Sequence, residues 1–98
     1  MVVTISFESV ARTLGISVEE AEKRAIIALI REELRRVRAE KALILSRYSV
    51  RGFKELWRKI EEDAVDDTVI HDDIIKLDYL EHREKELEGL LRELERSE

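Results

Sequence analysis

One long apolar stripe, uninterrupted by proline or glycine, constrains the fold most. Its residues recur at spacings of three and four, the repeat of one face of an α-helix. The stripe consists of Ile27, Ile30, Leu34, Val37, Lys41, Ile44 and Tyr48. We therefore predict a helix from Val18 to about Arg47, and Ser17 and Glu20 form a capping box at its start. A helix of about 45 Å hides such a stripe from water only against another long element.

A second long helix is predicted from Asp67 or Thr68 to the C-terminus. Its stripe consists of Ile70, Ile74, Leu77, Leu80, Leu87, Leu91 and Leu94, with Glu84 where a further apolar residue is expected. Between the two long helices, Gly52 opens a short helix with Phe53, Leu56, Trp57 and Ile60 on one face. We interpret Phe53 and Trp57 as core residues, with the alternative that they anchor a partner, because exposed tryptophans are common hot spots.

The N-terminus carries a different pattern. Val3, Ile5 and Phe7 alternate with Val2, Thr4 and Ser6, which predicts a β-strand from Val2 to Phe7. A lone strand leaves its backbone groups unpaired, so it pairs with a second copy or a partner protein, or does not form. A short helix from Ser9 to Leu14 is expected to follow and to end near Gly15.

Together these elements predict an all-α fold, a long helical hairpin with a short connecting helix and a short N-terminal β-strand. Residues 1–50 hold the strand and the first long helix, and residues 51–98 hold the short helix and an acidic helical arm. Two long helices do not by themselves enclose both stripes, so we predict a homodimer. The residues assigned to dimerisation are Val3, Ile5, Phe7, Ile27, Ile30, Leu34 and Val37.

Composition excludes several classes of protein. The chain has no cysteine, which excludes disulfides and thiolate metal sites. Its longest apolar run, Ala25 to Ile30, is far shorter than the roughly 20 residues that span a bilayer. With no leader-like segment at the start, the chain is interpreted as cytoplasmic. The lack of Asn, Gln and Cys beside abundant Glu, Lys and Arg suggests a thermophilic source.

The sequence offers little chemistry, so we expect no enzyme activity, no cofactor and no metal. It has neither a glycine-rich phosphate loop nor a G-x-S-x-G motif. His71, Asp78 and His82 share one helix face at a spacing that two metal ligands tolerate. This spacing arises often by chance on a charged helix, so we interpret the three residues as solvated surface.

Charge divides unevenly between the halves and leaves nucleic-acid binding as an alternative. Residues 1–50 carry nine basic and seven acidic side chains, and residues 51–98 carry nine and sixteen, giving net charges of +2 and −7. Arg35, Arg36 and Arg38 are placed to contact phosphates, and a strand before helices is the order of ribbon–helix–helix repressors. However, the strand has no Arg or Lys, and the arginines are spaced to pair with glutamates on the same helix.

Two stretches resemble small prokaryotic antitoxin-type proteins. Val3-Thr4-Ile5, Leu14-Gly15-Ile16-Ser17 and Glu19-Glu20-Ala21-Glu22 resemble a family in which a short strand precedes an L-G-[IL]-S-x-E-E helix. Residues 43–50 with Phe53-Lys54-Glu55-Leu56 are similar to the Y-G-[MV]-S-F-E-E-[FL] stretch of archaeal and cyanobacterial antitoxin-like proteins, although Ser49 and Arg51-Gly52 depart from it. In those proteins an Asp and a bulky residue about four positions later follow, and Asp73 and Leu77 match them.

The resemblance implies a non-enzymatic antitoxin that neutralises a small nuclease toxin. An acidic amphipathic arm suits such a basic partner, because apolar anchors supply affinity and carboxylates steer association. The alternatives are a homo-oligomeric structural or assembly protein and a dimeric DNA-binding regulator that uses Arg35, Arg36 and Arg38. The residues assigned to partner binding are Phe53, Trp57, Asp66, Asp67, Asp72, Asp73, Leu77 and Leu80.

Overall fold

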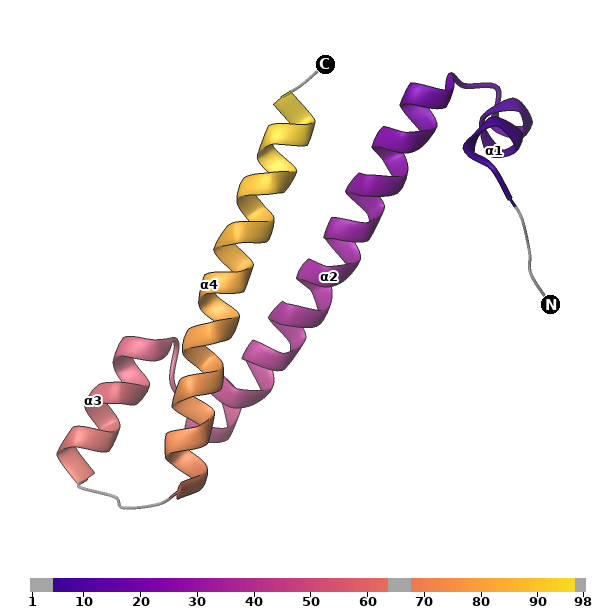
Figure 1. Cartoon of the computed structure of the whole chain (residues 1–98). Coiled ribbons are helices and arrows are strands. Elements are labelled where there is room, and N and C mark those ends of the chain that lie inside the picture. The colour runs from indigo at the N-terminus through magenta and orange to yellow at the C-terminus, as the bar shows by residue number, and fades with distance from the viewer. Residues whose placement is uncertain (1–4, 64–67, 97–98) are drawn as a thin grey trace.

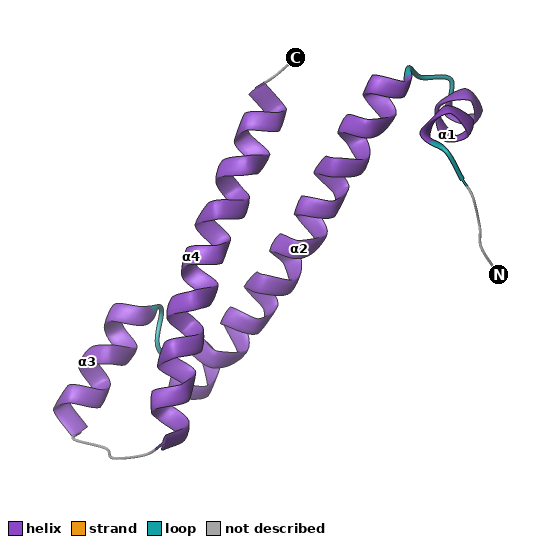
Figure 2. Cartoon of the chain, in the orientation of Figure 1, coloured by secondary structure: helices purple, strands orange, loops and turns teal. Residues whose placement is uncertain are grey.

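The chain folds into a long, open hairpin of helices in a computed structural model that describes residues 5–63 and 68–96. The helices are α1 (Phe7–Leu14), α2 (Val18–Tyr48), α3 (Phe53–Asp63) and α4 (Thr68–Arg96), and the described part of the chain has no strand. Figure 1 shows α2 and α4 running antiparallel, with α3 beside α4 and α1 at the far end of α2. We call the end near α3 the closed end, and the end where α2 begins and α4 finishes the open end. Figure 2 shows how short the described loops are.

Helix α2 begins where the capping residues place it and ends one residue later than expected. The Ser17 hydroxyl accepts a hydrogen bond from the backbone N–H of Glu20 at 3.1 Å. At the other end Ser49 adopts a left-handed conformation with φ 53°, and its N–H bonds back to the last turn. The Lys59 ammonium of α3 donates to the carbonyl of Tyr48 at 2.9 Å, so α3 is fixed against the end of α2.

Replacing Ser49 with Gly is expected to raise the free energy of unfolding by about 1 kcal/mol. A left-handed conformation costs a side-chain-bearing residue roughly 1–2 kcal/mol, and glycine adopts it without that penalty. Ser46→Gly is the matched control inside the last turn of α2, and it should destabilise by about 0.5 kcal/mol because glycine is the poorer helix former. Urea denaturation measures both changes. A loss of stability in Ser49→Gly would contradict the prediction.

The core lies between α2 and α4 and extends under α3. Buried side chains from these helices and from the loop after α2 form one cluster, which consists of Ile30, Leu34, Val37, Ile44, Val50, Leu56, Ile74, Leu77, Leu80 and Leu87. Leu56 and Leu77 are the most enclosed, at 1% and 0% exposure. The core therefore crosses the boundary between residues 1–50 and 51–98.

This core corrects the assignment of dimer contacts. Ile30, Leu34 and Val37 are buried within one chain, and Ile27 is half-buried in the same stripe. The expectation that a hairpin leaves both stripes exposed was wrong, because an antiparallel pair of helices turns one stripe onto the other. Ile30, Leu34 and Val37 therefore pack inside the hairpin, and their burial does not require a second copy.

The predicted strand is also corrected. Ser6 caps α1, since its hydroxyl accepts from the N–H of Ser9 at 3.2 Å, and Phe7 is the first helical residue. Ile5 precedes the helix in a non-strand conformation, and Val2 to Thr4, including Val3, lie outside the described residues. The helix starts two residues earlier than predicted and ends as expected at Gly15, which has φ 70°. A local side-chain cap was available, whereas the strand had no partner.

Candidate binding surfaces

A polar network closes the hairpin at the closed end. Asp73 of α4 accepts hydrogen bonds from Arg47, at 2.7 Å, and from the Tyr48 hydroxyl. Burial alone would raise the pKa of Asp73, but these two hydrogen bonds and the charges of Arg47 and Lys76 hold that pKa below its usual value. Burial, followed by the nearby Asp73 carboxylate, raises the pKa of Tyr48. Asp73, assigned above to partner binding, is thus engaged within its own chain.

A second network lies along one flat side of the hairpin, at the position where Glu84 interrupts the α4 stripe. The Glu84 carboxylate accepts from Lys41 at 2.8 Å and from Arg38 at 3.0 Å. The Lys41 hydrogen bond is the main cause that lowers the pKa of Glu84, with burial acting against it. Arg31 pairs with Glu95 on the same side at 3.1 Å. We call this side the charged face, formed by Arg31, Arg38, Lys41, Glu84, Glu88 and Glu95.

The opposite flat side carries exposed apolar side chains, and we call it the apolar face. On α2 its positions follow a second stripe with spacings of three and four, which consists of Ile26, Leu29, Glu33, Arg36, Glu40 and Leu43. On α4 it includes Lys76, Arg83 and Leu90, which are seven residues apart and so share one side. An ion pair of 3.6 Å between Lys76 and Glu40 places the two sets on the same side of the hairpin.

A groove on the apolar face joins the two helices. It has a volume of about 320 Å³ and is lined by Leu29, Ile30, Glu33, Arg83 and Leu87. Leu29 is 70% exposed beside it, and Ile26 and Leu90 are about half exposed. Large apolar side chains that remain in water next to a groove provide the area on which another helix can pack.

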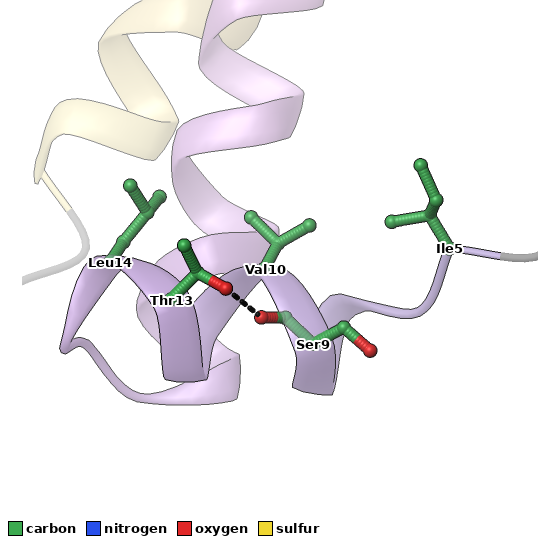
Figure 3. Close-up of a pocket in the computed structure, with 5 residues that line it drawn as sticks. All are labelled: Ile5, Ser9, Val10, Thr13 and Leu14. Carbon is green, nitrogen blue, oxygen red and sulfur yellow. Dashed lines mark hydrogen bonds between the residues drawn. The ribbon is translucent and has the colours of Figure 1, made fainter.

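Helix α1 offers a second apolar hollow at the open end. Figure 3 shows Ile5, Val10 and Leu14 pointing to the same side, with Ser9 and Thr13 below them. The Thr13 hydroxyl donates to the carbonyl of Ser9 at 3.0 Å, so its polar group is turned back onto the helix. Among the residues of α1, Ala11 is the buried one. Most of the apolar side of α1 is therefore solvent-exposed.

The residues assigned to partner binding separate into three groups. Leu77 and Leu80 are core residues at 0% and 3% exposure, so the prediction that they act as exposed anchors is corrected. Phe53 and Trp57 stack with ring centroids 6.3 Å apart, and Trp57 is 47% exposed while Phe53 is half-buried. Asp72 is exposed on α4. Asp66 and Asp67 lie outside the described residues.

The arginines considered for nucleic acid are engaged with acidic side chains. Arg35 pairs with Glu32 at 2.6 Å, and Arg36 reaches the same carboxylate at 3.9 Å. Arg38 is bound to Glu84 on the charged face. The same-helix pairing that the spacing predicts is found for Arg35 and Arg36, whereas Arg38 pairs with a glutamate of α4.

A cleft between α3 and α4 has acidic side chains in its wall that also bond within the chain. It has a volume of about 350 Å³, and both Glu81 and Glu84 lie in its wall. Glu81 accepts from the N–H of Phe53 at 3.1 Å and so caps α3, and Glu84 is bound by Lys41. Both glutamates are thus engaged in contacts within the chain.

The described ranges contain neither a metal-ligand cluster nor a helix suited to span a membrane. Within residues 5–63 and 68–96, no three His, Cys, Asp or Glu side chains come together to hold a metal ion. His82 contacts the carbonyl of Asp78 at 2.8 Å on the exposed surface. Over the same ranges, no helix combines the length and apolar character needed to cross a bilayer.

Sequence reasoning missed the apolar face. The signal was present, because Ile26, Leu29 and Leu43 fall on their own three-and-four repeat beside the first stripe. No separate surface was predicted from these three residues. Charged residues between them concealed the repeat.

The chain belongs to a protein family whose model matches residues 1–98 and carries the description "Uncharacterized protein MJ0235 family". No curated protein and no solved structure matches the chain.

Proposed function

We propose that the chain is a non-enzymatic protein that acts by binding other proteins, and that it does so as a dimer. The observation that supports this most is its uncovered surface. The solvent-accessible area is 7719 Å². A compact protein of this size exposes about 5,800 Å². The radius of gyration is 19.5 Å, against about 13 Å for a compact chain of 100 residues.

The exposed apolar side chains support the same proposal. Each of the four helices has at least one large hydrophobic residue in water, including Val10 on α1, Leu29 on α2, Trp57 on α3 and Tyr79 on α4. Single exposed residues are ordinary, but a hairpin that forms a single layer of helices leaves whole faces uncovered. Such a shape suits an element that is completed by another protein.

The antitoxin resemblance gives this proposal its specific form, in which the partner is a small basic nuclease. Trp57 is the anchor that remains available at the closed end, since Leu77 and Leu80 are in the core. Exposed carboxylates on α4, such as Asp72, would steer a basic partner. A homo-oligomeric assembly protein without a nuclease partner is the alternative, and DNA binding is less favoured because Arg35, Arg36 and Arg38 are paired with carboxylates.

The test is binding to the product of the adjacent gene, since antitoxins are normally encoded beside their toxins. We expect the full chain to bind that protein and to inhibit its nuclease activity. Trp57→Ala should weaken binding at least tenfold, or about 1.4 kcal/mol, because it removes an aromatic anchor. Isothermal titration calorimetry measures the dissociation constant.

Arg35→Glu, on the outer side of α2, is the control variant, and it should leave this binding within threefold of the wild type. An adjacent gene product that neither binds nor is inhibited would overturn the nuclease form of the proposal. Unchanged binding by Trp57→Ala would move the contact away from α3.

A further inference from the structure

We propose that a second copy of the chain docks on the apolar face, with its α2 antiparallel to the first α2. The two-fold axis passes between Leu34 and Arg35. The inference rests on the proposed function in one respect, that uncovered surface is binding surface, and it names the face, the occupant and the register.

The two flat sides of the hairpin differ in how far their charges are satisfied internally. On the charged face, ion pairs such as Arg31–Glu95 and Lys41–Glu84 cross from α2 to α4 at 2.8–3.1 Å. The apolar face has two cross-helix ion pairs among the described residues, Lys76–Glu40 at 3.6 Å and, at the closed end, Arg47–Asp73 at 2.7 Å, and it exposes large apolar side chains over the rest of its length. Covering the apolar face removes hydrocarbon from water without breaking the ion pairs of the other side.

When two copies run antiparallel, oppositely charged residues of the two apolar faces lie opposite each other. The axis pairs Ile26 with Leu43 of the second copy, and Leu43 with its Ile26. It also places Glu33 opposite Arg36, twice by symmetry, which is the isologous arrangement of a two-fold dimer. A parallel arrangement would instead place Glu33 opposite Glu33 and Arg36 opposite Arg36, and facing like charges are unfavourable.

The neighbouring registers are poorer. A shift of one heptad in one direction places Ile26 opposite Arg36, and a shift in the other places Leu43 opposite Glu33. In the proposed register, each copy also places its Glu22 opposite Arg47 of the second copy and its Leu29 opposite Glu40 of the second copy. The Glu40 carboxylate is partly neutralised by Lys76 of its own chain at 3.6 Å. The spacing of these layers, alternately three and four residues, is that of antiparallel helices packed knobs-into-holes.

The available area is sufficient for a stable dimer. Helix α2 has 31 residues. It is therefore about 46 Å long, and two adjacent helices are about 20 Å wide, so the face measures about 900 Å². In this register α2 is covered along its whole length and α4 along about half of its length, so the two faces bury about 1,400 Å² in total, which is within the range of a standard specific interface. The dimer is a four-helix bundle in which each hairpin supplies one layer.

Charge-swap variants of the full chain test the register by sedimentation equilibrium. We expect the wild type to be a dimer at 20 µM, a concentration on the order of those at which dimers of this interface size persist. E33R and R36E should each weaken dimerisation at least tenfold, because each places like charges face to face. The E33R/R36E double variant should return within about threefold of the wild type, since the swapped charges attract again.

Matched controls come from the same helix and from α4. Arg35 lies three residues from its partner Glu32 but on the outer side of α2, so R35E should leave the dimer unchanged. Leu29→Glu should give a monomer, whereas Ile75→Glu should not, although their side chains are equally exposed at 70% and 68%.

Three results would overturn the inference: a wild-type monomer at 100 µM, a dimer indifferent to E33R and R36E, or a double variant that is not restored. A wild-type monomer would also overturn the dimer named in the proposed function, whereas binding of a nuclease partner is tested separately by Trp57→Ala and the adjacent gene product. Conversely, loss of that binding partner leaves the charge-swap result intact.

Discussion

Replacing Leu77 with Ala is expected to lower the free energy of unfolding by about 3–4 kcal/mol. Leu77 is 0% exposed and belongs to the cluster in which α2, α3 and α4 meet. Removing a buried leucine side chain loses its transfer free energy and leaves a cavity, with a typical total of 2–5 kcal/mol. A domain of this size is stable by only about 5–15 kcal/mol, so the loss is a large fraction of the total.

Ile75→Ala is the control two residues earlier on the same helix, where the side chain is 68% exposed. It should change stability by no more than about 0.5 kcal/mol. Urea denaturation followed by circular dichroism, at one fixed protein concentration, measures both variants. A Leu77→Ala loss below 1 kcal/mol would place the core elsewhere.

Asp73→Asn is expected to cost about 2 kcal/mol at neutral pH, because hydrogen bonds to a charged group contribute about 1.5–3 kcal/mol. The pKa of Asp73 is lower in the folded chain than in the unfolded one. Its carboxylate therefore stabilises the fold fully above its unfolded pKa of about 3.9, and that stabilisation is lost as the pH falls through the lower folded pKa. The difference between wild type and variant should shrink correspondingly below pH 4.

Two variants separate this effect from general damage. Tyr48→Phe removes one of the two donors to Asp73 and should cost about 1 kcal/mol, a smaller loss. Asp72→Asn changes the exposed neighbouring carboxylate and should stay within about 0.5 kcal/mol. Denaturation curves at pH 7, 5 and 3 provide the comparison. A penalty for Asp73→Asn that is independent of pH would refute the ionic origin of the effect.

The long helices were predictable because their signals are local. The Ser17–Glu20 capping box and an unbroken apolar repeat determine where α2 starts and which side is buried. The start of α3 near Gly52 and the end of α1 at Gly15 followed from the same kind of local reasoning. At each of these positions the residue that stops or starts the helix makes its contacts within a few residues.

Over residues 5–7, the part of the predicted strand that the structure describes, the prediction was wrong because the alternation was considered without a pairing partner. Ile5 and Phe7 suit a strand by composition, but Ser6 can cap a helix at once and needs no second chain. The prediction that the α2 stripe forms dimer contacts was wrong for a different reason. Whether Ile30, Leu34 and Val37 face another copy or another helix of the same chain depends on tertiary pairing, which one helix's periodicity does not specify.

The charged residues that interrupt the two apolar stripes indicate how the long helices pair, although no such pairing was predicted from them. Lys41 lies in the α2 stripe and Glu84 in the α4 stripe, each where an apolar residue was expected. Opposite charges at two such positions indicate helices that face each other there, and the structure joins them at 2.8 Å. Exposure of Trp57, by contrast, depends on how α3 turns against α4, so periodicity alone assigned it to the core.

The position of α3 between the two long helices also affects how the hairpin assembles. At the closed end Arg47 and Asp73 are 26 residues apart, whereas at the open end Arg31 and Glu95 are 64 residues apart. Forming the contact across the longer loop first costs about 0.8 kcal/mol more in conformational entropy. We therefore expect contacts between the helices to form at the closed end first and then to extend toward the open end. Amide exchange should then be slowest around Leu77 and fastest at the open end. Leu29 and Leu90 lie toward the open end, where local unfolding is expected first. A second copy on the apolar face would therefore stabilise the part of the fold with the lowest local stability.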